Sequence, residues 1–150
     1  MPNNIVVSVV KFVWERRQFI ADAIAFIRKF LKDNPDLVDW AKRRLASIAE
    51  GISAVKGMPS GSARVRGTAV LARREAEALQ TESTGVPASA SASWIQRADE
   101  IERALAVAEK SPEATQPEAI DSLTTDADQL VAEIIETVAT SGRRLSKPTE

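Results

Sequence analysis

Residues 5–56 decide the fold, and they read IVVSVVKFVWERRQFIADAIAFIRKFLKDNPDLVDWAKRRLASIAEGISAVK. Apolar side chains recur every three or four residues on both sides of Asn34-Pro35-Asp36, which is the period of an amphipathic helix. Asn34 is suited to capping a helix, and Pro35 to its first position. The sequence therefore predicts one helix over about 5–32 and a second up to Lys56, joined as an antiparallel hairpin because the break is short.

Aromatic side chains are concentrated in this hairpin: six of the seven in the chain lie within its first forty residues. These six are Phe12, Trp14, Phe19, Phe26, Phe30 and Trp40. Two rows of heptad spacing run along the first helix: Ile5, Phe12, Phe19 and Phe26 form the Phe26 row, and Val9, Arg16, Ala23 and Phe30 form the Phe30 row. Because aromatic side chains bury the largest apolar areas, this face is expected either to nucleate the core or to contact a partner.

The predicted interaction surface follows from these rows. Its residues are Phe12, Trp14, Arg16, Phe19, Ile20, Phe26, Ile27, Phe30 and Trp40. Arg16 interrupts the Phe30 row, and we expect its head group to extend along the edge of the apolar face toward water.

The rest of the chain is divided by composition. Residues 1–82 are basic and aromatic-rich and end in a thin middle helix over about 66–82, whereas residues 83–93 form a Ser/Ala-rich flexible linker. Residues 94–142 are predicted to form an acidic helical hairpin, followed by a disordered tail over 143–150. The fold class is therefore all-α, a helical bundle of about five helices with an aromatic N-terminal hairpin, a middle helix and an acidic C-terminal hairpin.

Individual residues predict where these helices begin and end and which of their faces are buried. Ser93 and Gln96 have the spacing of a capping box, and Gly142 is expected to stop the last helix. The predicted core face of the second helix is Leu37, Ala41, Leu45, Ile48, Ile52 and Val55. That of the last helix is Ile120, Leu123, Ala127, Leu130, Ile134 and Val138.

The composition excludes most site chemistry, because the chain has no His, Cys or Tyr. Disulfides, thiolate or imidazole metal sites, and Ser-His-Asp or Cys-His catalysis are therefore impossible. Ser53-Ala-Val-Lys56 matches a Ser-x-x-Lys pattern of serine enzymes, but the motifs that complete such a pocket are missing. We predict a protein that is not an enzyme and has no catalytic residues, metal site, cofactor or small-molecule substrate.

Charge is unevenly distributed. Residues 1–80 carry 14 Lys and Arg against 8 Asp and Glu, whereas residues 81–142 carry 3 against 12. This asymmetry suggests docking between the two halves or between copies of the chain, and the alternative is two separately solvated faces. The acidic group Asp99, Glu102, Glu109, Asp126, Glu133 and Glu136 fits a solvated or partner-facing surface better than a metal site.

Function is predicted from the aromatic face: a non-enzymatic helical interaction or assembly protein that buries this face in self-association or against a protein partner. One alternative is a peripheral membrane protein that uses the basic amphipathic helix 5–32. A second is a nucleic-acid accessory protein, which is disfavoured because residues 41–93 offer no aromatic side chain for stacking on bases. A cytoplasmic location is expected, since no apolar run reaches the roughly 20 residues that span a bilayer.

Overall fold

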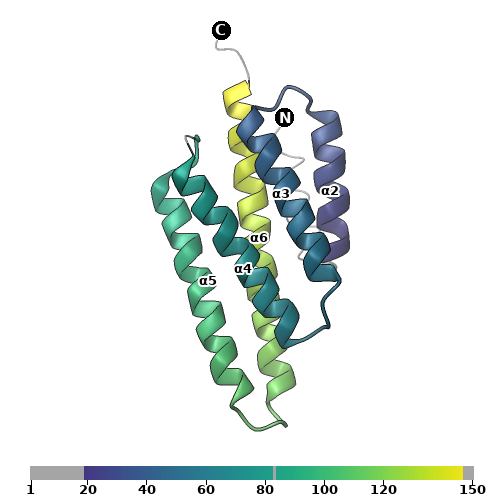
Figure 1. Ribbon diagram of the computed structural model, residues 1–150, viewed down its shortest axis with the longest axis vertical. Coiled ribbons are helices and arrows are strands. Elements are labelled where there is room, and N and C mark those ends of the chain that lie inside the picture. Colours follow the sequence, from purple (N-terminus) through teal and green to yellow (C-terminus); the bar gives the residue numbers. More distant parts are fainter. Residues whose placement is uncertain (1–18, 83, 147–150) are drawn as a thin grey trace.

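The computed structural model describes residues 19–82 and 84–146, and the side chains of residues 22–82 and 84–143. Five helices make up this part of the chain, with no strand among the described residues (Figure 1). They are α2 (Phe19–Asp33), α3 (Asp39–Lys56), α4 (Ser62–Thr81), α5 (Ala88–Glu109) and α6 (Gln116–Ser146). The prediction of an all-α helical bundle is confirmed.

The longest helix, α6, holds the bundle together because it contacts α2, α3, α4 and α5. Figure 1 shows it running along the length of the molecule, with α2 and α3 beside its C-terminal half and α5 beside its N-terminal half. All predicted core residues of α6 are buried except Ile120, which is half-buried against the core. A single apolar stripe on α6 thus gives the other helices a common surface to cover.

The predicted core face of the second helix is confirmed, since all six of its expected residues are buried; five of them lie in α3, and Leu37 lies in the turn before it. The start of α3 differs from the prediction. Asn34 ends α2 instead of capping α3: its side-chain Nδ2 donates to the carbonyl of Phe30 at 2.9 Å. Val38 is the N-cap and makes no side-chain cap hydrogen bond, so Asn34-Pro35-Asp36 is a turn between the two helices.

The predicted flexible linker over 83–93 is wrong for residues 88–93, which form the first turns of α5. Pro87 is the N-cap instead of Ser93, so the capping box at Ser93 is wrong as well. Ser91 is fully buried and Ala90 is half-buried against the core. Small side chains here let α5 pack closely on its neighbours, and alanine adds helix propensity that a reading of the segment as a linker misses.

The middle helix predicted over about 66–82 begins earlier than expected, because α4 starts at Ser62. The predicted stop at Gly142 is also wrong, because α6 continues through it to Ser146 and includes the first four residues of the predicted tail. A Cβ at Gly142 would overlap the Cβ of Ala41 and lie 3.0 Å from Cδ2 of Leu37. This glycine therefore serves close packing of α6 against α3 and does not end the helix.

The close approach at Gly142 predicts a stability effect. Gly142→Ala should lower the free energy of unfolding by about 1–3 kcal/mol, because the added methyl group forces α3 and α6 apart. Gly57→Ala is the matched control: a Cβ there would lie 3.5 Å from the carbonyl oxygen of Ala54, an ordinary contact, and its φ of −76° suits alanine. Urea-induced unfolding of both variants measures the difference, and equal stability of the two would contradict this account of the helix crossing.

Candidate interaction surface

The α2 helix lies at the edge of the bundle, where it packs on α3 and makes a smaller contact with α6 (Figure 1). Its inward side chains are Ala23, Ile27 and Phe30, with 2%, 0% and 2% of their surfaces exposed. Trp40, on the first turn of α3, is also buried. In this conformation Ile27, Phe30 and Trp40 contribute to the core of the chain itself, where a partner would not reach them.

The two rows of the first predicted helix differ in how well they are covered. Ala23 and Phe30, the described members of the Phe30 row, are fully buried. Phe26, the described member of the Phe26 row, is only half-buried at the edge of the core. Its ring centroid lies 5.5 Å from that of Phe30, with the rings tilted by 36°. The apolar surface of α2 is therefore wider than the surface that its neighbours fully cover.

The other predicted interaction residues lie outside the described part. Phe12, Trp14 and Arg16 precede it, and Phe19 and Ile20 begin α2 but their side chains are not described. By sequence register, Phe12 and Phe19 continue the row to which Phe26 belongs. On the outer side of α2, the basic side chains Arg28, Lys29 and Lys32 are exposed.

The basic residues of α4 pair with the acidic residues of α5. Arg66 Nη2 lies 2.8 Å from Glu109 Oε1, and Arg73 Nε lies 3.0 Å from Asp99 Oδ1. Arg73 also pairs with Glu102, and this hydrogen bond is the main reason that its pKa lies above its ordinary value. Of the two readings of the charge asymmetry, the structure therefore shows docking between the halves within one chain.

A second charged cluster joins α3 to α4 around Glu75, which is only 1% exposed. Its carboxylate accepts a hydrogen bond from Ser47 Oγ at 2.6 Å and from Arg44 Nη1 at 3.1 Å. Arg74 Nη2 lies 3.4 Å away, and Arg44 Nε also lies 3.2 Å from Glu82 Oε1. A buried carboxylate needs such partners, since an unpaired one is strongly destabilising. This cluster fixes the register of α3 on α4.

Most of the arginines that could bind the phosphates of a nucleic acid are already paired with carboxylates of the chain. Arg43, Arg44, Arg66, Arg73 and Arg74 all contact carboxylates of the chain. Arg64 instead donates to the carbonyl oxygens of Lys56 and Met58, at 3.3 and 3.0 Å. Positive charge that is already neutralised contributes little to the binding of phosphates.

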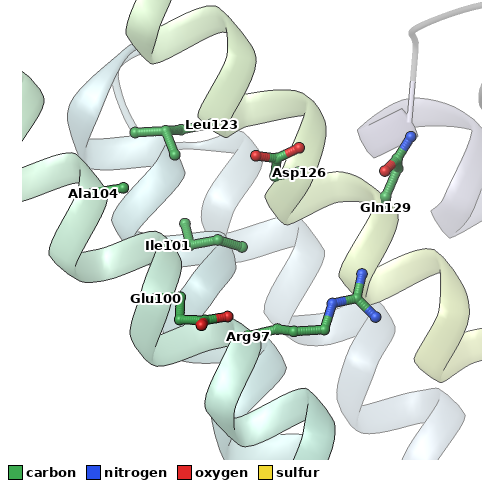
Figure 2. A pocket seen from close by; sticks show the side chains of 7 residues that line it. All are labelled: Arg97, Glu100, Ile101, Ala104, Leu123, Asp126 and Gln129. Carbon is green, nitrogen blue, oxygen red and sulfur yellow. The ribbon is translucent and has the colours of Figure 1, made fainter.

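Between α5 and α6 lies a pocket of about 310 Å³ (Figure 2). Its lining residues are Arg97, Glu100, Ile101, Ala104, Leu123, Asp126 and Gln129. The sequence of neither helix predicts this pocket, because the pocket depends on the distance between the two helices. Hydrophobic periodicity does not report that distance. Among the described residues no group of three or more acidic side chains could hold a metal ion. Ser53 and Lys56, the Ser-x-x-Lys pair, are both exposed on the last turns of α3.

No described helix is both long enough and apolar enough to cross a bilayer. No family model matches the sequence, and neither a curated protein nor a solved structure is significantly similar to it. The function must therefore be argued from the surfaces described above.

Asp128 on α6 is half-buried, and this desolvation raises the pKa of its carboxyl from 3.8 to about 7, although the charge of Arg64 opposes the shift. As the pH rises from about 4 to 7, the unfolded chain loses this proton before the folded chain does. The contribution of Asp128 to the free energy of unfolding therefore falls over this range.

Replacing Asp128 with Asn removes this effect. We expect Asp128→Asn to be more stable than the wild type by about 2–4 kcal/mol at pH 8, since each unit of pKa shift corresponds to about 1.4 kcal/mol. At pH 4 the two proteins should unfold at similar temperatures. Thermal unfolding followed by circular dichroism at both pH values tests this, with the exposed Asp121→Asn as a control. A stability difference that does not change with pH would contradict it.

Proposed function

We propose that this chain is a non-enzymatic helical assembly protein that docks, through the Phe26 row of its N-terminal region, on a second copy of itself or on a partner helix. The observation that carries the proposal is the unequal cover of α2: Phe30 and Ala23 are sealed in the core, whereas Phe26 is only half-buried. Phe12 and Phe19 occupy the same row in sequence. An aromatic side chain that is left half-exposed at the edge of a bundle, as Phe26 is, is typical of a protein–protein contact.

The described packing favours protein over lipid as the partner of this row. To insert the apolar face of α2 into a membrane, the helix would have to remove Ile27 and Phe30 from contact with the core, which would forfeit their burial. Docking through the Phe26 row leaves these side chains in place. Among the described side chains of α2, the exposed Arg28, Lys29 and Lys32 would suit an anionic membrane surface.

Sedimentation velocity over a range of protein concentrations tests the proposal. Phe12→Asp and Phe26→Ala should each weaken association at least about tenfold, since both shorten the aromatic row. Ala25→Asp is the matched control for Phe12→Asp. It adds the same charge at a position that is exposed on α2 and outside the row, so this variant should associate like the wild type. Co-sedimentation with vesicles containing anionic lipid, measured for the same variants, tests lipid as the partner.

A monomeric wild type that binds anionic vesicles, with Phe12→Asp abolishing that binding, would overturn the proposal in favour of the membrane alternative. Association unchanged in both aromatic variants would overturn it as well.

The two rows should also differ in their contribution to stability. Phe30→Ala should lower the free energy of unfolding by about 3–5 kcal/mol, because it opens a cavity in the core. Phe26→Ala should cost about 1–2 kcal/mol, because the half-buried ring loses less apolar contact. Urea-induced unfolding at a concentration where the protein is monomeric measures both values. Equal costs would mean that the two rows are equally covered within the chain.

A further inference from the structure

The pocket between α5 and α6 combines an apolar floor with charged sides. Ile101 and Leu123 form the floor, with 7% and 9% of their surfaces exposed, and Ala104 leaves room above them. Figure 2 shows Glu100 on α5 and Asp126 on α6, with Ile101 and Leu123 between the two helices. Both carboxylates belong to exposed residues, so a ligand could reach them from solvent.

The only cation in the lining is already engaged. Arg97 pairs with Glu133 through two hydrogen bonds, Nη1 to Oε1 at 2.7 Å and Nη2 to Oε2 at 2.9 Å. That pairing is the main reason that the pKa of Arg97 lies above its ordinary value, and the charges of Asp126 and Glu100 raise it further. Glu133 therefore neutralises the cation of the lining, and the carboxylates of Glu100 and Asp126 leave the mouth of the pocket negative.

We propose that this pocket binds the side chain of a lysine or arginine that a partner polypeptide presents. The methylene groups of such a side chain would pack on Ile101 and Leu123, and its cationic head would pair with Glu100 and Asp126. An anionic ligand would be repelled by the same carboxylates, and a purely apolar one would leave their charges uncompensated. Charge complementarity thus selects a basic peptide segment as the occupant.

The inference goes beyond the proposed function, because α5 and α6 supply this pocket and α2 takes no part in it. The two proposals can fail separately. The pocket can be titrated with small probes at protein concentrations where the chain is monomeric, so the result does not depend on self-association through the Phe26 row.

Titration of the full chain, followed by NMR amide shifts, tests the pocket with four probes at constant ionic strength. N-acetylarginine methylamide, a blocked arginine, should bind with a dissociation constant on the order of a millimolar and shift signals of residues 97–104 and 120–130. Guanidinium ion lacks the methylene groups and N-acetylnorleucine methylamide lacks the charge, so each should bind at least about tenfold more weakly. The fourth probe, n-propylguanidinium, carries the same head and stem without a peptide backbone and should bind no tighter than the blocked arginine.

Variants at exposed positions locate the effect. Glu100→Gln and Asp126→Asn should each weaken binding of the blocked arginine about three- to tenfold, because each removes one charged partner. Ala104→Leu should block the pocket by filling it. Glu118→Gln, an exposed acidic residue in the first turn of α6, is the matched control and should bind like the wild type.

Equal binding of guanidinium ion and the blocked arginine would overturn the proposal, since the apolar floor would then play no part. So would equal weakening by Glu118→Gln, which would indicate general attraction to an acidic surface. n-Propylguanidinium binding tenfold tighter than the blocked arginine would overturn the polypeptide as the source of the cation. Absence of saturable shifts up to about 50 mM blocked arginine would overturn the site itself.

Discussion

Burial of one apolar stripe along α6 is the constraint on which the rest of the structure depends. Leu130, Ile134 and Val138 are almost completely excluded from water, and α6 contacts each of the other described helices. Alanines and Gly142 on the same helix allow α3 to approach closely. Because the four other described helices all contact α6, a change in its position would disturb the packing of each of them.

Ion pairs help to set how neighbouring helices are aligned along their lengths in this apolar packing. The pairs between α4 and α5 have partly exposed side chains, and each contributes little to stability. Together they align a basic helix with an acidic one, so part of the charge asymmetry of the sequence is neutralised within the chain. Glu75 differs from these pairs because it is buried, and its hydrogen bonds from Ser47 and Arg44 admit only one alignment of α3 and α4. Burial of apolar surface thus drives the helices together, and the buried carboxylate of Glu75 favours one alignment of the packed helices over others.

The sequence predicted best where the apolar period was long and strong. The faces of α3 and α6 were correct almost to the residue, since their periodicity reflects burial directly. The predictions failed where small residues have two meanings. Residues 88–93 resembled a linker and Gly142 resembled a helix end, yet both are helical, and Ser91 and Gly142 lie buried against neighbouring helices. Asn34 had the chemistry of a cap, but it ended the preceding helix.

Site prediction was limited for a related reason. Periodicity grouped Ile27, Phe30 and Phe26 on one face, but it could not tell which of them the neighbouring helices would cover. The pocket at Ile101 and Leu123 had no signal in either segment alone, because it arises from the spacing between two helices. Arg97 and Glu133 are 36 positions apart, and no local pattern links them.

The length of α6 has a consequence for any assembly that contains this chain. Its 31 residues span about 46 Å, with α2 beside the C-terminal half and the pocket on the N-terminal half. Two partners bound at these places would be kept at a fixed separation by a continuous helix. Binding of one partner would raise the effective concentration of a second partner that is linked to it. In this arrangement the length of α6 would set the distance between the two partners.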